Sequence, residues 1–253
     1  MTPRSGGDGI DPDAFAALLC EWCLEVRPEQ QVLIGTTTLA EPFVTALHHA
    51  IVERDAWPLL RLEPPVLTAD FYRHARPAQL DAFAPLELTE VQVVDAVLRI
   101  DAPANTRQLA GIDPATIARA ARARAPIQKA RLAGRWCGTL WPTPALAQQA
   151  EMSESDYAAF VTRALFLDRN EPVAAWRELS ERQQLLVEQL RTARNIRVEA
   201  DGTDLSCGWM GGRGSTPTAA ATCRAGRCSR GRWRTRRKGR SASTSPRVLA
   251  ASR

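Results

Sequence analysis

A strand, a helix and a second strand follow one another between residues 31 and 62, and this pattern restricts the fold most. The run QVLIGTT (Gln31–Thr37) is short, apolar and rich in β-forming residues, which predicts a buried strand. Glu41-Pro42 opens a helical stretch, because proline fits the first turn of a helix. WPLLRL (57–62) predicts the next strand. A strand, helix and strand within about 35 residues form a βαβ unit. We therefore predict an α/β fold with a parallel sheet flanked by helices.

The rest of the first 205 residues continues to alternate between helices and strands. The apolar run VQVVDAVLRI (91–100) predicts a core strand. RWCGTL (135–140) and NIRVEA (195–200) predict two more, and an Asp-Gly turn follows the last. Ser153 is a typical N-cap, followed by an acidic first turn. Helical spacing and helix-start signals predict helices over residues 11–26, 68–74, 78–83, 105–109, 113–125, 127–133, 153–167 and 172–194.

The charge of the chain is divided between two unlike segments. The stretch after Leu205 holds 12 of the 33 Lys and Arg residues and no Asp or Glu, so the first 205 residues have a net charge of −7. The same stretch is poor in branched aliphatic residues, and it cannot bury enough apolar surface to offset chain entropy. We predict a disordered N-terminus at 1–10, an α/β domain at 11–205 and a disordered basic tail at 206–253.

Composition also bears on the cellular compartment. No run of 18 apolar residues occurs, which predicts no membrane-spanning helix and no membrane partner. The first 15 residues lack the apolar stretch of a secretory signal. We therefore expect a cytoplasmic protein, in which Cys20, Cys23 and Cys137 of the domain and the three cysteines of the tail form no structural disulfides.

Two short motifs could carry redox or metal chemistry, but their positions favour structural roles. CEWC (20–23) matches CxxC, which in redox proteins lies at a helix start after a strand, whereas here it falls inside a predicted helix. His48 and His49 precede Glu53, yet adjacent helical residues point about 100° apart and cannot share one ion with it. We interpret the cysteines as one partly buried helix face and the histidines as surface residues. His74 stands alone and is expected to be solvated or bonded to backbone.

Two further segments could bind phosphate groups. GTTT (35–38) lies between a strand and a helix, but it lacks the glycines and lysine of a P-loop, so a plain loop with a threonine cap is favoured. RGRWRTRRKGR (230–240) combines arginines with Trp233 and is expected to bind nucleic acid non-specifically at low salt. GC-rich DNA read out of frame yields the same composition. No catalytic, cofactor-binding or metal-binding residue is therefore predicted in this chain.

A series of short motifs marks residues 141–205. It contains Trp-Pro-Thr at a strand end, Met-Ser at a helix start, an ALFLDR stretch, Pro172 with Trp176, and a closing DGTDL. In this combination the segment resembles the thermophilic metallo-aminopeptidases, whose bacterial members are called aminopeptidase T, aminopeptidase S and aminopeptidase II. Residues 11–62 also look like the opening helix and first βαβ unit of that family. The resemblance covers residues 11–205 and implies an enzyme that removes N-terminal amino acids from peptides with the help of metal ions.

The resemblance also implies what the chain lacks. Members of the family hold two divalent metal ions (Zn, Co or Mg) through glutamates, histidines, a tyrosine and an aspartate. The first glutamate lies in a motif close to NMPSGEVFTGP, and the other ligands lie in a C-terminal domain. None of them can be placed on a residue of this chain, so we expect it to bind no metal ion and to be inactive. Peptides are the substrates that the family implies, and a homodimer is one assembly the chain could form.

The composition after Leu205 is explained by a lost reading frame. When the frame is moved one base upstream, WMG (209–211) is forced to encode Asp-Gly, the turn expected here in the family. TCRAGRCSRGR (222–232) then permits MPSGEVFTGP at all ten shifted positions, with the glutamate codon overlapping Arg227. Two shifted codons must encode the residues expected in the family, and ten further shifted codons can encode them. This agreement favours a frameshift and a truncated product.

Two other functions stay open from the residues alone. An acidic domain with a basic arm could be a non-enzymatic protein that binds nucleic acid or an acidic partner. Residues 11–205 could instead be a dimerisation module that assembles with an intact relative. Metal-dependent turnover of aminoacyl p-nitroanilides separates an enzyme from both alternatives, and deletion of residues 206–253 tests the arm.

Overall fold

The structure is a computed structural model that describes residues 9–192, 195–208 and 247–252. The chain divides into two units, Met1–Ala175 and Trp176–Arg253. The disorder predicted for the N-terminus lies outside the described residues except at Gly9 and Ile10, and Ile10 is buried in the first unit. Its aliphatic side chain gains by burial, so the packed chain begins there rather than at residue 11.

The first unit is built on a four-stranded sheet in which all strands run parallel, as predicted. Its order is β2-β1-β3-β4, with β1 at Gln31–Thr37, β2 at Trp57–Glu63, β3 at Ala96–Asp101 and β4 at Arg135–Leu140. The helix α2 (Glu41–Val52) connects β1 to β2, which confirms the βαβ unit. The chain then returns to the other side of β1 to form β3.

The prediction of one strand over residues 91–100 is wrong in its first half. Residues up to Val93 belong to the helix α5 (Pro85–Val93), and β3 begins only at Ala96. Proline at the first helical position starts α5, and Glu90 in its second turn binds Arg61 of β2. The carboxylate of Asp95 accepts a hydrogen bond from the backbone N–H of Gln31 at 2.8 Å, which places the start of β3 beside β1.

An aromatic stack forms the centre of the core of this unit. The ring of Phe43 on α2 lies 4.4 Å from the ring of Phe15 on α1 (Pro12–Leu18) and 5.1 Å from that of Trp141 after β4. Asp11 caps α1 by accepting hydrogen bonds from two backbone N–H groups of the first turn. The predicted helix 11–26 ends earlier, because α1 passes into one π-helical turn at Leu19–Cys23.

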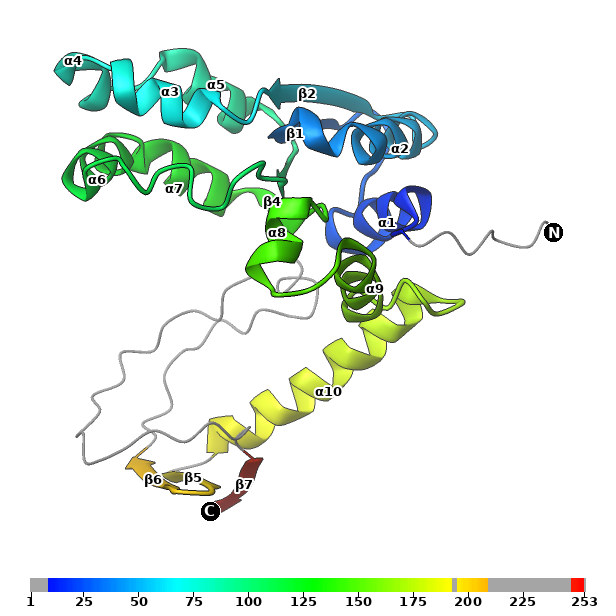
Figure 1. Cartoon of the computed structure of the whole chain (residues 1–253). Helices are drawn as coiled ribbons and strands as arrows, with labels where there is room; N and C mark the ends of the chain where they lie inside the picture. Colours follow the sequence, from blue (N-terminus) through cyan, green and yellow to red (C-terminus); the bar gives the residue numbers. More distant parts are fainter. Residues whose placement is uncertain (1–8, 193–194, 209–246, 253) are drawn as a thin grey trace. The chain divides into compact units, whose positions relative to one another are not determined.

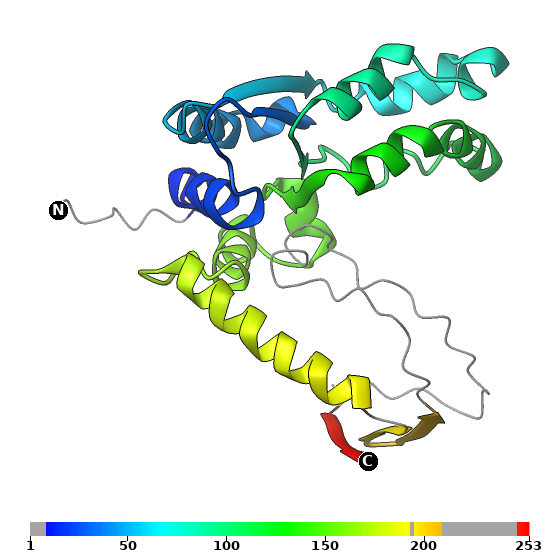
Figure 2. The same ribbon diagram turned by 180° about the vertical axis from the view of Figure 1, so that it is seen from behind.

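Two sets of helices extend together from the carboxyl-terminal edge of the sheet, toward which the arrow of β2 points (Figure 1). Figure 2 shows the same arrangement from behind. Arg119 pairs with Asp81, and Arg124 pairs with Glu87 at 2.9 Å, so two ion pairs join the sets. The first set consists of α3 (Leu67–His74), α4 (Pro77–Leu80) and α5. The second set consists of α6 (Pro114–Ala123) and α7 (Ala125–Ala133).

The helix predicted at residues 105–109 is a series of turns instead. The side chain of Asn105 accepts a hydrogen bond from the backbone N–H of Arg107 at 2.8 Å, and such a local bond competes with a helical one. The helix α8 (Pro144–Gln149) is capped by Thr143. The predicted cap at Ser153 is confirmed, since its hydroxyl accepts from the N–H of Asp156 at the start of α9 (Glu154–Ala164).

The second unit contains a three-stranded antiparallel sheet of order β6-β5-β7. Its strands are β5 at Asn195–Ala200, β6 at Thr203–Gly208 and β7 at Arg247–Ser252, and the long helix α10 (Pro172–Thr192) precedes them. Gly202, with φ of 72°, makes the predicted turn between β5 and β6. Disorder predicted for the whole tail does not hold in β7 or at the end of β6, where backbone groups pair across the sheet. Residues 209–246 lie outside the described residues.

Candidate functional site

The CxxC motif is enclosed in the core. Cys20 and Cys23 have no exposed surface, and they lie in the π-helical turn after α1. Burial raises the pKa of the Cys20 thiol to about 11, and the positive charge of Arg54 offsets only part of this effect. A thiol that stays protonated at neutral pH is a poor nucleophile and a poor metal ligand. This environment agrees with the packing role favoured from the sequence.

The three histidines lie on the surface of their helices, as predicted. His48 and His49 are both exposed on α2. His74 is exposed at the end of α3, with its Nδ1 3.0 Å from the carbonyl oxygen of Asp70 and 3.2 Å from the Asp70 carboxylate. In the part of the chain that the structure describes, no three His, Cys, Asp or Glu side chains are arranged to hold a metal ion. Nor is any described helix both long and apolar enough to cross a membrane.

The GTTT segment forms the end of β1 and the turn after it. Thr37 caps a short 3-10 helix at Thr38–Ala40, which confirms the predicted threonine cap. Its hydroxyl also donates to the carbonyl oxygen of Ala102 at 2.5 Å, which ties the ends of β1 and β3 together. Thr36 is buried, and its hydroxyl has no hydrogen-bond partner in the described residues.

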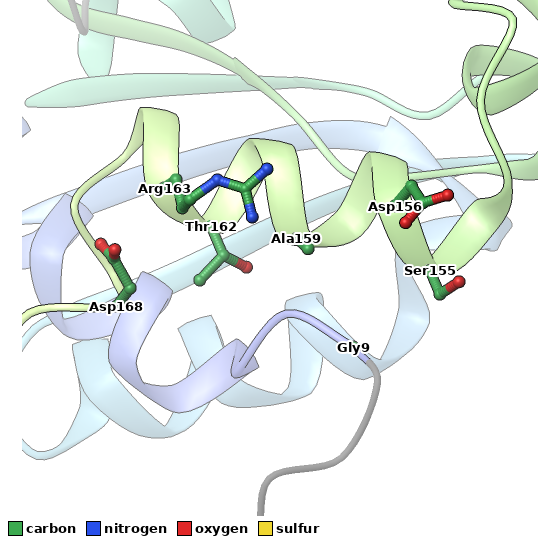
Figure 3. A pocket seen from close by; sticks show the side chains of 7 residues that line it. All are labelled: Gly9, Ser155, Asp156, Ala159, Thr162, Arg163 and Asp168. Atoms are coloured by element: carbon green, nitrogen blue, oxygen red, sulfur yellow. The ribbon is translucent and has the colours of Figure 1, made fainter.

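One hollow in the first unit, of about 540 Å³, is an open groove along α9 (Figure 3). Most of its labelled residues are spread along α9, whereas Gly9 precedes α1 and Asp168 follows α9, and the side chains do not converge on one point. Two of its polar groups already serve the helix, because the Asp156 carboxylate accepts from Ser153 and the Thr162 hydroxyl donates to a backbone carbonyl. The groove is lined by Gly9, Ser155, Asp156, Ala159, Thr162, Arg163 and Asp168.

The smaller hollow, of about 150 Å³, lies at the carboxyl ends of β1, β2 and β3. The chain leaves β1 toward β2 on one side and returns to β3 on the other, so this edge is the point where the strand order reverses. Open α/β sheets bind ligands at such a reversal. Charged side chains of β2 and β3 line this hollow, and no sequence motif had identified them: Arg61, Glu63, Arg99 and Asp101.

These features define the class of the first unit, a parallel α/β domain with a polar cavity at its switch point. Residues 11–220 match the thermophilic metalloprotease (M29) family. The chain belongs to this family. The match extends to residue 220, past Leu205, where the resemblance seen in the residues stops.

Two relatives indicate how much of the family fold is present. The chain is 27% identical to aminopeptidase 2 of Geobacillus stearothermophilus over 209 residues, which is 75% of this chain and 50% of that protein. Its structure is similar to wild-type AmpT from Thermus thermophilus, with a TM-score of 0.62 and 20% identity, over 78% of this chain and 53% of that one. The second similarity supports the α/β fold. The chain spans about half the length of each relative.

Proposed function

We propose that this chain provides the N-terminal α/β domain of a metal-dependent aminopeptidase and does not hydrolyse peptides by itself. The observation that carries the proposal is the family match over residues 11–220, together with a relative named aminopeptidase that the chain covers by half. The substrates are peptides with a free N-terminus, and the metal ions are two divalent cations such as Zn²⁺, Co²⁺ or Mg²⁺.

The chemistry explains why the domain needs a second half. Hydrolysis at two metal ions requires ligands that hold the ions about 3.5–4 Å apart, so that they activate a water and stabilise the oxyanion. By resemblance, those ligands follow the segment that corresponds to residues 11–205. The buried thiols and the exposed histidines of the first unit are poor substitutes for them. The role of this chain is then to support a site that another segment completes.

We further propose that the reading frame was lost after Leu205. The stretch after Leu205 contains twelve basic residues and no acidic residue. This composition and the shifted-frame matches at 209–211 and 222–232 support a frameshift. Sequencing of the gene around the codon of Leu205 tests this directly. An unbroken frame that encodes residues 206–253 in independent DNA preparations contradicts it.

A pair of proteins tests the proposed activity. The first is the chain of 253 residues, and the second is the product of the same gene with one base added or removed to restore the shifted frame. Both are assayed on aminoacyl p-nitroanilides with added Co²⁺ or Zn²⁺, and with EDTA as the metal-free control. We expect metal-dependent turnover from the restored product alone. Metal-dependent turnover by the chain itself refutes its inactivity, and no turnover by either refutes the aminopeptidase assignment.

The remaining partners follow from the same proposal and have simple tests. We place the protein in the cytoplasm, which fractionation of cells that carry the native gene checks. A homodimer is expected to give twice the chain mass in light scattering. Retention on nucleic acid is expected only at low salt and only with residues 230–240 present, because their arginines release counterions from phosphates.

A further inference from the structure

The strand β2 forms one edge of the four-stranded sheet, and no described strand pairs with its outer side (Figure 1). The backbone N–H of Trp57 donates to the carbonyl oxygen of Gln30 at 2.7 Å, on the side of β1. Backbone groups alternate in direction along a strand, so those of Pro58, Leu60 and Leu62 point away from the sheet. An unpaired edge of this kind is a template for another strand.

Prolines limit how far this edge can pair. Pro58 has no N–H, and its outward position agrees with the confinement of proline to edge strands. Pro64 follows β2 directly and removes the next outward donor. The outward N–H donors of β2 are therefore those of Leu60 and Leu62. A partner strand has to offer acceptors to these two groups.

The same edge exposes apolar side chains. Leu60 and Leu62 are 43% and 39% exposed, and they share one face of β2 with Pro58. Trp57, on the other face, is 65% exposed. Val52, which ends α2 just before β2, is exposed as well. Apolar side chains gathered along an unpaired edge favour association through that edge.

The sequence of β2 is complementary to itself when two copies run antiparallel about a two-fold axis through Leu60. In this register Leu60 faces the same residue of the second copy, Pro58 faces Leu62, and Trp57 faces Glu63. Each Leu60 N–H then donates to the Leu60 carbonyl of the other copy. Each Leu62 N–H donates to the Pro58 carbonyl, so both outward donors of the strand are paired.

Length and charge favour the same register. Leu60 is the middle residue of β2, so this is the only two-fold antiparallel register that pairs the strand over its whole length. Arg61 lies opposite Leu59, and its charge is neutralised by Glu90, whose carboxylate oxygens are 3.0 and 3.2 Å from its Nε. Moving the axis by one residue sets Arg61 directly opposite itself, and like charges in that position are destabilising.

We propose that the outer edge of β2 is an interface between two copies of this chain, whose β2 strands pair antiparallel and join the two sheets into one. The second copy is the occupant because the two-fold pairing matches the donors, the apolar side chains and the charges of β2 with those of the same strand. The inference rests on the homodimer proposed above and not on aminopeptidase activity, so the two can fail separately.

Charge exchange on the two-fold axis tests the interface. Light scattering of the full chain under reducing conditions gives the dissociation constant of the dimer. Leu60→Lys and Leu60→Glu are each expected to raise it at least about tenfold, because each removes an apolar contact and opposes two like charges. An equimolar mixture of the two variants brings opposite charges together and is expected to dimerise about fivefold more tightly than either alone.

A matched variant separates the edge from the rest of the surface. Leu86→Lys makes the same change at a leucine of α5 that is 64% exposed, and it is expected to leave the dissociation constant within about twofold. Urea midpoints of all variants check that each one folds. A chain that stays monomeric up to about 200 µM, or a dimer that Leu60→Lys does not weaken, overturns the proposal.

Cross-linking tests the register. Paired residues at the axis have Cα atoms about 5.5 Å apart, within the range for a disulfide. Leu60→Cys is therefore expected to form a covalent dimer on mild oxidation with copper–phenanthroline. Trp57→Cys is the control on the same strand, because it would lie about 20 Å from its own copy and should not cross-link. Equal cross-linking of the two variants overturns the register. Both are made in a chain that carries Cys207→Ser, Cys223→Ser and Cys228→Ser.

Discussion

Replacing Phe43 with alanine removes the ring at the centre of the aromatic stack in the first unit. The ring has no exposed surface and lies nearly parallel to Phe15 and to Trp141, with interplanar angles of 16° and 15°. Truncation of a buried phenylalanine costs about 3–5 kcal/mol. Each aromatic contact that is lost accounts for about 0.5–1.5 kcal/mol beyond burial. We therefore expect Phe43→Ala to lower the free energy of unfolding by about 4 kcal/mol, near the middle of the range for truncation.

Urea unfolding monitored by far-ultraviolet circular dichroism measures this change. Fluorescence is less suitable, because the substitution itself alters the surroundings of Trp141. With a slope of about 2–3 kcal/mol per molar urea, the midpoint should fall by roughly 1.3–2 M. Leu86→Ala on α5 is the control, since Leu86 is 64% exposed and its loss should cost less than about 0.5 kcal/mol. A cost below about 1.5 kcal/mol for Phe43→Ala, well under the range for buried rings, would refute the stack as the core.

Two further predictions concern the first helix and the buried thiol. Asp11→Ala should lower the free energy of unfolding by about 1 kcal/mol in the same assay, because it removes the acceptor of two backbone N–H groups. Asp11→Asn keeps a side-chain oxygen and should retain most of this stability. Equal losses in the two variants would contradict the cap. The raised pKa of Cys20 means that the folded chain keeps a proton that the unfolded chain loses, so stability should fall as pH rises from 9.0 toward about 11. The fall in the free energy of unfolding should reach at most about 1.4 kcal/mol per pH unit, and it should be smaller in Cys20→Ala. Urea midpoints at pH 8, 9 and 10 measure it. If the midpoints of both proteins change equally, the Cys20 thiol is not the cause.

Local sequence signals predicted the bounds of a strand or helix where the flanking residues end it. β1 and β4 have the predicted bounds, since each is a short apolar run with polar residues or a proline-rich stretch after it. The caps at Thr37 and Ser153 were also predictable, because their hydroxyls act on backbone groups two or three residues away. The run at 91–100 has no such boundary, so its periodicity could not separate the end of α5 from β3.

The candidate site was not predictable in the same way. Arg61 and Arg99 lie on strands far apart in the chain, and neither belongs to a motif that indicates binding. A strand carries charged residues at its end in many proteins without binding anything. Only the pairing of Gly35 with Arg99 brings the guanidinium over β1.

The sequence by itself determined the class of fold, the family and the break in composition at Leu205, because these depend on residue type, local spacing and short motifs. The order β2-β1-β3-β4 was decided only in the tertiary structure, and with it which strand ends meet at the cavity. The physical reason is that strand order follows from how helices far apart in the chain bury their apolar faces together. No local pattern encodes that choice, so the charges of Arg61 and Arg99 come to lie on either side of Gly35 only when the sheet is complete.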